Sequence, residues 1–190
     1  IHSHVSHWKS KGIDIEHIQR TGRTGYKAGA LAYGLTSAKG EFVAIFDADF
    51  RPQKTFLHQT MGQFDAPDIA MVQTRWTHTN RDENPLTKLT AILLDGHFVL
   101  EHQARHLSGR YFNFNGTAGI WRKSSIEAVG GWQHDTITED LDLSYRAQLA
   151  GWRFVFLPDV LCPAELPATM EAFKVQQHRW AQGGIQTLKK

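Results

Sequence analysis

The central motif of the chain is Glu41-Phe42-Val43-Ala44-Ile45-Phe46-Asp47-Ala48-Asp49-Phe50-Arg51-Pro52. Its five apolar residues at 42–46 predict a short strand that is buried on both faces of a parallel sheet. Asp47 and Asp49 follow the strand and point the same way if the chain stays extended. Ligands of open α/β sheets bind at this edge, so the acid pair suits a divalent cation that also holds phosphate oxygens. An ordinary polar turn is the alternative.

Composition predicts one globular domain. The chain has 190 residues, of which 41% are hydrophobic and 21% are charged, and this is ordinary for a domain with its own core. A net charge of +2 without a dense Lys/Arg block argues against nucleic acid as a partner. No apolar run approaches the roughly 18 residues that span a bilayer. Cys162 is the one cysteine, which favours a reducing compartment.

A basic, glycine-rich loop precedes the central motif. The alternation at 13–18 predicts a strand, and 20–31 then leads into an Ala/Leu-rich helix that should end near Gly40. Such a loop can present backbone N–H groups and Lys27 to phosphate. It has neither the P-loop ending nor G-x-G-x-x-G, so a plain strand-to-helix turn stays open.

The middle of the chain predicts alternating helices and strands. We expect a helix over 52–64, a strand over 69–74 and a long helix over 86–107. His102 and His106 on that helix have zinc-ligand spacing, although a polar helix face is the preferred interpretation because no third ligand is evident. The aromatic and glycine-rich segment 112–121 predicts a bulged strand or a place where backbone closely approaches a ligand.

A second acidic motif, Thr138-Glu139-Asp140, begins another predicted helix. Thr136 and Glu139 fit a capping box, and acids are favoured in a first helical turn without any chemistry. The alternative is that one carboxylate faces a cleft and takes a proton from a sugar hydroxyl. Both hold if Glu139 caps and Asp140 reacts. The predicted apolar stripe of this helix consists of Leu141, Tyr145, Leu149 and Trp152.

The last third predicts a strand over 153–158, a proline-limited edge segment over 160–167 and a final helix from Ala168. On that helix Gln176, Arg179 and Trp180 share one face. An amide, a guanidinium and an indole suit a sugar and a phosphate, although a buried Trp beside an extended Arg would give the same pattern.

Four motifs in this order resemble the family 2 glycosyltransferases, in particular the membrane-bound processive β-glycan synthases. They are Arg23 to Leu31, Asp47-Ala48-Asp49, Thr138-Glu139-Asp140 and Gln176-x-x-Arg179-Trp180. The residues of these motifs are similar to those of cellulose-synthase-like enzymes that make mannan or glucan backbones. The resemblance implies a GT-A fold, an α/β fold with a mixed, mostly parallel sheet flanked by helices. Residues 1–75 would form the donor-nucleotide and metal half, and 76–190 the acceptor half, of a single domain.

The resemblance also implies an activity, which is inverting transfer of a hexose from a nucleoside-diphosphate sugar, UDP-glucose or GDP-mannose, to a β-glycan acceptor with Mg²⁺ or Mn²⁺. Asp140 would be the general base beside Glu139, and Asp49 with Asp47 would hold the metal. The implied donor-binding residues are Lys27, Asp47, Gln176 and Arg179. The implied acceptor-binding residues are Trp180, Asn115 and Gly116.

The chain departs from the family pattern in its first part. The family's first strand and a further Asp-rich motif are not found before Ile13, and the chain begins without Met. We therefore expect a soluble or peripheral catalytic segment, without its first sheet strand and of doubtful activity alone. Its parent would be an integral membrane protein acting at the cytoplasmic face. A non-catalytic nucleotide-sugar-binding module is one alternative. A phosphohydrolase of the haloacid-dehalogenase type is another, although Arg51 stands where that motif has Thr or Val.

Overall fold

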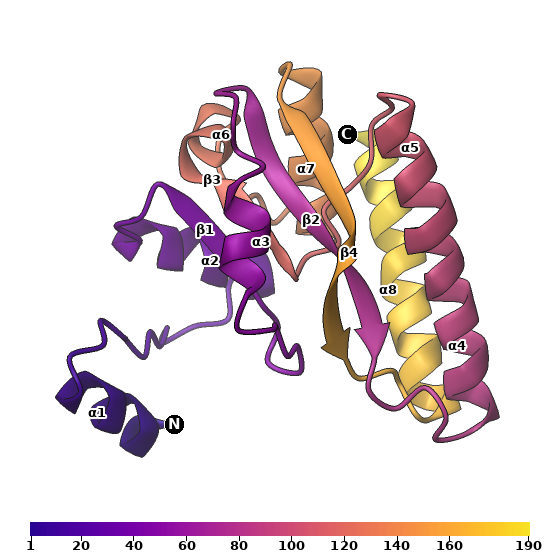
Figure 1. Ribbon diagram of the computed structural model, residues 1–190, viewed down its shortest axis with the longest axis horizontal. Coiled ribbons are helices and arrows are strands. Elements are labelled where there is room, and N and C mark those ends of the chain that lie inside the picture. Colours follow the sequence, from indigo (N-terminus) through magenta and orange to yellow (C-terminus); the bar gives the residue numbers. More distant parts are fainter.

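Four strands form one mixed sheet in the computed structural model, which describes residues 1–190 (Figure 1). The strand order is β1-β3-β2-β4. The strands are β1 (Phe42–Ile45), β2 (Ile69–His78), β3 (Gly119–Arg122) and β4 (Arg153–Ala164). The pairs β1–β3 and β3–β2 are antiparallel, and β2–β4 is parallel. The mixed α/β architecture is confirmed, and β1, β2 and β4 run in the same direction, with β3 antiparallel between β1 and β2.

Strand β1 lies at the edge of the sheet and is not the doubly buried parallel strand that its apolar run predicts. Its neighbour in the sheet is β3, and Ala44 is exposed. The run is apolar because helices cover both faces: Val43 and Ile45 pack into a large core cluster, and Phe42 packs into a small one. Residues 13–18, which we expected to form a strand, lie outside the sheet although they keep an alternation in burial.

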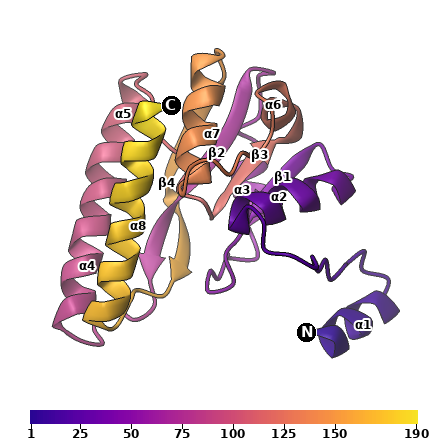
Figure 2. The same ribbon diagram turned by 180° about the vertical axis from the view of Figure 1, so that it is seen from behind.

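Two hydrophobic clusters hold the sheet between layers of helices. The large cluster lies on the face covered by α2 (Tyr26–Ser37), α6 (Lys123–Ala128) and α7 (Glu139–Leu149), and Trp121 is fully buried in it. The small cluster forms around Phe56 of α3 (Phe56–Met61) and Ile120. Trp121 and Ile120 thus point to opposite faces, as neighbours in a strand must. Helix α3 lies before the sheet in Figure 1, and α7 lies before the other face in Figure 2.

The long helix that the sequence predicts is continuous but changes its geometry in the middle. It consists of α4 (Pro85–Asp95), a π-helical segment η1 (Gly96–His102) and α5 (Gln103–Leu107). Asn84 caps its start by accepting hydrogen bonds from the N–H groups of Leu86 and Thr87. It runs beside α8 (Met170–Lys189) in both views (Figures 1 and 2). The π segment is rare in proteins and is often found at functional sites.

Strands β2 and β4 are longer than predicted. β2 continues to His78, beyond the strand expected over 69–74. β4 joins the two predicted segments into one edge strand, and the ladder shifts register between the pairs Thr74–Leu157 and Arg75–Leu161. The edge position agrees with the prolines of this segment, which cannot donate to a ladder. Helix α3, in contrast, is shorter than the helix expected over 52–64.

Three details of the last helices differ from expectation. No capping box forms at α7, because Thr138 is the N-cap and Thr136 Oγ1 donates to the carbonyl of Thr138. The expected apolar stripe is wrong as well, since Leu149 is 73% exposed and the buried face of α7 carries other residues. These are Glu139, Asp142, Leu143, Ser144, Ala147 and Gln148. Helix α8 also continues through Gly183-Gly184, although the helix propensity of glycine is low.

Gly183 is explained by close helix packing. A Cβ at Gly183 would lie 2.3 Å from Thr138 Cγ2, so the absence of a side chain lets α8 approach the start of α7.

The N-terminal helix α1 (His2–Ser10) buries no residue and lies apart from the sheet (Figure 1). None of the helices combines the length and apolar character that a bilayer crossing needs.

Candidate active site

All ten residues that the sequence analysis assigned to a site line one cavity of about 250 Å³. The cavity opens where β1 ends and where α2 and α7 begin, and α8 closes its far side. The ten residues are Lys27, Asp47, Asp49, Asn115, Gly116, Glu139, Asp140, Gln176, Arg179 and Trp180. Four motifs that are far apart in the sequence therefore meet in one place.

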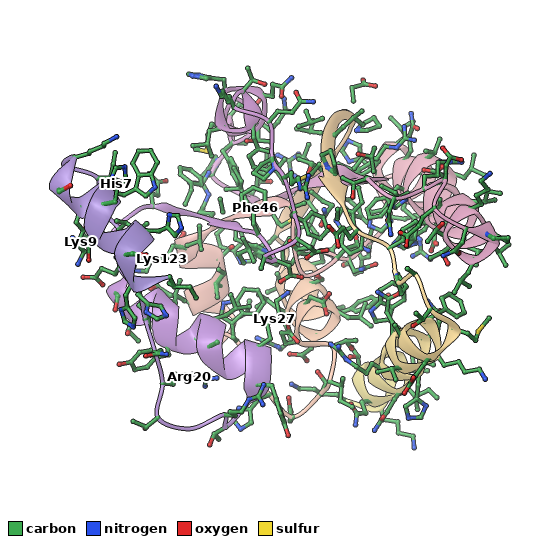
Figure 3. All side chains as sticks on the ribbon, turned by 90° about the horizontal axis from the view of Figure 1, so that it is seen from below. His7, Lys9, Arg20, Lys27, Phe46 and Lys123 are labelled. Atoms are coloured by element: carbon green, nitrogen blue, oxygen red, sulfur yellow. The ribbon has the colours of Figure 1, made fainter.

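Lys27 joins its own motif to the Asp47–Asp49 motif and to the segment 112–121. Its Nζ lies 2.5 Å from Asp47 Oδ1 and donates a second hydrogen bond to the carbonyl of Gly116 at 3.0 Å. Figure 3 shows Lys27 near the middle of the molecule, whereas His7 and Lys9 lie out on α1. The backbone N–H of Asp47 in turn donates to Thr117 Oγ1 at 2.8 Å. The first turn of α2, the end of β1 and the loop before β3 are thus held together by polar contacts.

Gly116 brings the backbone directly against Asp140. Its φ is +82°, and a Cβ there would lie 2.9 Å from Asp140 Oδ2 and 3.6 Å from Lys27 Nζ. A side chain at this position would therefore meet both strain and a clash. The expectation that backbone closely approaches something at 112–121 is confirmed, and what it approaches is a carboxylate. Residues 112–118 are irregular, so the strand in this region is only β3.

The two acids at the start of α7 lie in an environment that favours their neutral forms. Burial, with the neighbouring Glu139 carboxylate as the second cause, raises the pKa of Asp140 to about 7. Burial also raises the pKa of Glu139, which is 8% exposed. Lys27 opposes both effects. Asp140 therefore holds its proton weakly near neutral pH, which is the property of a general acid or base.

The donor set at the end of β1 fits a hard divalent cation that shares its coordination with a ligand. Asp49 is exposed to the cavity, and its carboxylate forms no ion pair in the protein. Asp47 uses Oδ1 for Lys27 and keeps a second oxygen. One or two carboxylates with phosphate oxygens are the usual protein set for Mg²⁺. No three His, Cys, Asp or Glu side chains gather to bind a metal by themselves.

The zinc alternative for His102 and His106 is wrong. His102 is buried, and its Nε2 is bonded to the carbonyl of Asn113 at 3.0 Å. Burial lowers the pKa of His102 to about 4, with His97 as a smaller cause. The histidine therefore belongs to the core, where it packs among the rings of Phe98, Phe112 and Phe156.

The cavity wall carries buried polar atoms that have no hydrogen-bond partner in the protein. They are Trp76 Nε1, His78 Nε2, Asn115 Oδ1 and Gln176 Oε1. Buried polar atoms are usually paired, so four orphans around one cavity indicate a ligand that has several hydrogen-bonding groups. The sequence analysis missed Trp76 and His78 because it ended the strand at Thr74. It also missed Thr117, which lies inside the quoted block 112–121.

Gln176, Arg179 and Trp180 project from one face of α8 into this region, as their spacing predicts. Trp180 is 36% exposed, so its indole is not buried in the core. It also lines a second cavity of about 460 Å³ that shares Asn115 and Asp140 with the first. A third cavity of about 680 Å³ lies beside the first turn of α2 and shares Lys27, Glu139 and Arg179 with the first. The three cavities form a groove with Asp140 near its middle.

A mixed sheet with paired acids at a strand end and two further acids across the cavity defines an α/β domain with its ligand site at a sheet edge. The chain belongs to glycosyl transferase family group 2, because the model of that family matches residues 42–189. Family membership gives no support to the phosphohydrolase alternative.

Named relatives sharpen this picture. The chain is 46% identical to "Glucomannan 4-beta-mannosyltransferase 2" of Arabidopsis thaliana and 45% identical to "Glucomannan 4-beta-mannosyltransferase 1" of Oryza sativa subsp. japonica. Both matches cover 96% of this chain, which spans 35% and 36% of the relatives' lengths. The similarity to cellulose-synthase-like mannan synthases is thereby confirmed.

Solved structures confirm the GT-A fold. Mannosyltransferase PcManGT from Pyrobaculum calidifontis, in complex with GDP-Man and Mn²⁺, matches with a TM-score of 0.67 at 23% identity, over 97% of this chain and 49% of its own. S. aureus TarS matches with a TM-score of 0.59 at 15% identity, over 94% of this chain and 31% of its own.

Proposed function

We propose that this chain forms the catalytic site of an inverting glycosyltransferase that moves a hexose from a nucleoside-diphosphate sugar to the end of a β-glycan. The observation that carries the proposal is Asp140. Its carboxylate, with a pKa raised to about 7, faces the cavity that also holds Lys27 and the acids after β1. A base of this pKa is matched to a proton transfer at neutral pH.

The donor diphosphate belongs at the junction of the first and third cavities. Lys27 and Arg179 line both and supply positive charge to phosphate oxygens. The start of α2 lies in the same place, and a helix N-terminus favours an anion. Gln176, whose Oε1 is unpaired in the protein, accepts a hydrogen bond from a hydroxyl of the donor sugar.

Asp49 and Asp47 are the residues that hold Mg²⁺ or Mn²⁺ with the diphosphate. When bound, the metal supplies positive charge that stabilises the departing diphosphate. Asp47 also anchors Lys27, so the ammonium and the metal-binding oxygens are held as one unit. Manganese is present in the complex of PcManGT, and the choice between Mg²⁺ and Mn²⁺ is a matter for titration.

Asp140 performs the chemistry on the acceptor. Its carboxylate takes the proton of the acceptor hydroxyl while that oxygen forms a bond to the anomeric carbon. The bond from the anomeric carbon to the diphosphate breaks on the opposite face, so an α-linked donor gives a β-linkage. Glu139 lies beside Asp140 and raises its pKa, which strengthens the base. Trp180 offers its indole to the terminal acceptor ring, and Asn115 and Gly116 line the acceptor side.

The relatives' names support mannose as the transferred sugar and a β-1,4-linked glucomannan as the product, and the GDP-Man complex of PcManGT supports GDP-mannose as the donor. The test is radiolabel transfer by the full-length protein from GDP-mannose and from UDP-glucose, with Mn²⁺ or Mg²⁺, followed by linkage analysis of the product. We expect transfer from GDP-mannose into β-1,4-linked product. Donor binding without any transfer would contradict the proposal and favour a non-catalytic nucleotide-sugar-binding module.

We also propose that the protein acts at the cytoplasmic face of a membrane and that residues 1–75 and 76–190 form its donor and acceptor halves. The exposed apolar side chains of Val175, Ile185 and Leu188 on α8 support contact with a further surface. Separation of membrane and soluble fractions, combined with protease protection of sealed vesicles, tests the location. Protein recovered only in the soluble fraction would contradict it.

A further inference from the structure

The π-helical segment η1 carries a chain of polar side chains that ends at the cavity wall. His97 Nδ1 lies 3.0 Å from Glu101 Oε2, and His97 Nε2 lies 2.9 Å from Asn115 Nδ2. Arg105 Nη2 holds the other oxygen of Glu101 at 2.9 Å. His97 and Asn115 both line the second cavity, together with Asp140 and Trp180.

The carboxylate at the far end fixes the direction of the hydrogen bonds. An ionised Glu101 only accepts, and its pKa is lowered by His97 and Arg105 against the effect of burial, so His97 Nδ1 carries the proton. An amide nitrogen can only donate, so Nε2 of the same ring accepts from Asn115 Nδ2. The amide oxygen of Asn115 is thereby turned away from His97.

The amide oxygen of Asn115 ends this series of hydrogen bonds and has no partner within the protein. Asn115 Oδ1 is buried and has no hydrogen-bond partner, although the backbone N–H of the same residue donates to Gln73 Oε1 at 2.9 Å. A fixed backbone and a fixed amide that leave one acceptor unpaired indicate a ligand donor. Because Asn115 lines both the first and the second cavity, the donor belongs to a molecule that lies beside Asp140.

We propose that Glu101 and His97 are positioning residues that orient the Asn115 amide so that its oxygen accepts a hydrogen bond from a hydroxyl of the glycan acceptor. The inference rests on the proposed function. The proposed positioning role belongs to two residues that contact neither the donor nor the metal. It also explains the π segment, which places His97 next to both Glu101 and Asn115.

The test compares acceptor KM, donor KM and kcat of the full-length protein with β-1,4-mannohexaose and GDP-mannose. His97→Leu removes the lone pair that holds the Asn115 amide, so we expect acceptor KM to rise about three- to tenfold while donor KM stays unchanged. His97→Gln keeps a side-chain oxygen for Asn115 Nδ2 and should restore most of the loss. Glu101→Gln lets the imidazole adopt the other tautomer, and acceptor KM should rise here as well.

His106→Leu is the matched control, because it makes the same chemical change more than two turns further along the helix, away from Asn115, and should leave all three constants unchanged. Thermal unfolding of each variant shows whether the fold is kept; if His97→Leu unfolds, Glu101→Gln decides. Unchanged acceptor KM in the folded variants, or an equal rise of donor KM, would show that His97 and Glu101 do not position Asn115 for the acceptor. Transfer by the wild type would still support the proposed function in that case. Absence of transfer by the wild type would instead overturn the proposed function.

Discussion

Two pairs of acids face the same cavity but lie in opposite environments. After β1, Asp47 is paired with the ammonium of Lys27, and Asp49 is exposed. At the start of α7, Glu139 and Asp140 are enclosed next to each other, and the pKa of Asp140 is raised to about 7. Carboxylates beside a cation stay charged, whereas enclosed neighbouring carboxylates gain protons more easily. In the proposed function, the same type of side chain therefore serves as a cation ligand in one pair and as a base in the other.

The largest expected effect separates the two pairs directly. Asp140→Asn keeps the shape of the side chain but cannot take a proton, so kcat should fall by about 10²–10⁴-fold. Donor binding in the presence of Mn²⁺ should stay near the wild-type value, because Asp140 does not hold the diphosphate. Steady-state kinetics and titration calorimetry with GDP-mannose measure the two quantities. Wild-type kcat in this variant would remove Asp140 from the chemistry.

Asp49→Asn should show the reverse pattern. The loss of a charged oxygen ligand should weaken metal-dependent donor binding by at least about 10–100-fold, the range found for groups that only orient a metal ligand. Titration of activity with Mn²⁺ at fixed GDP-mannose measures this change, and saturating metal should recover part of the rate. Equal metal requirements in variant and wild type would show that the exposed acid has no such role.

Gly116→Ala tests how tightly the second pair is enclosed. A Cβ at Gly116 would lie 2.9 Å from Asp140 Oδ2, so the carboxylate must move, and displacements of this kind cost about 10–100-fold in rate. Gly151→Ala is the matched control, because Gly151 also has a positive φ, +93°, but nothing within 4 Å of its Cβ position. Urea unfolding should show a loss of about 1–2 kcal/mol for Gly151→Ala and at least as large a loss for Gly116→Ala, where a clash adds to the backbone strain. Only Gly116→Ala should lose activity; equal activities would mean that the carboxylate relaxes freely.

The sequence predicted the members of both pairs but not the difference between them. Motif spacing and the resemblance brought together all ten site residues that line the cavity. The apolar run at 42–46 predicted the strand but not its edge position, because a strand covered by helices on both faces has the same pattern as a central one. The enclosure of Asp140 depends on Gly116 and Glu139 together, and distant chain segments create it only on folding.

Other features had no signal in a local pattern. Gly183-Gly184 predicts a break by propensity, yet close packing against Thr138 overrides that propensity in the folded protein. Sequence spacing does not distinguish His97 from the other histidines of the chain. Its hydrogen bond to Asn115 joins residues 18 positions apart in sequence, through a π segment that periodicity does not reveal.

Glu139→Gln should reduce the contrast between the pairs without abolishing activity. The Glu139 charge is the second cause, after burial, of the raised pKa of Asp140, so its removal lowers that pKa. The acidic limb of the kcat/KM profile, with a midpoint near pH 7 in the wild type, should move to lower pH by roughly one unit or less. Because neighbouring acids titrate as a pair, the midpoint describes both. If the acidic limb of the kcat/KM profile does not move, burial alone raises the pKa of Asp140.

The smallest effect concerns stability and has the opposite sign to the effect on activity. The folded pKa of Asp140, about 7, exceeds its ordinary value of 3.8, so the folded protein holds this proton more tightly than the unfolded chain. Its contribution to stability is therefore complete below pH 3.8 and is lost as pH rises through 7. Asp140→Asn has no proton to lose, so its Tm should exceed that of the wild type at pH 8.

The expected gain is several degrees, since 1 kcal/mol corresponds to roughly 2–4 °C for a domain of this size. The gain should become small near pH 4, where Asp140 is protonated in the folded protein and close to its ordinary pKa of 3.8 in the unfolded chain. Asp49→Asn is the control, because an exposed acid without a partner should leave Tm unchanged at both pH values. Calorimetric scans at pH 4 and pH 8 measure all three proteins. A variant that kills transfer but stabilises the fold would show that the enclosed acid is kept for its chemistry, against its own effect on stability.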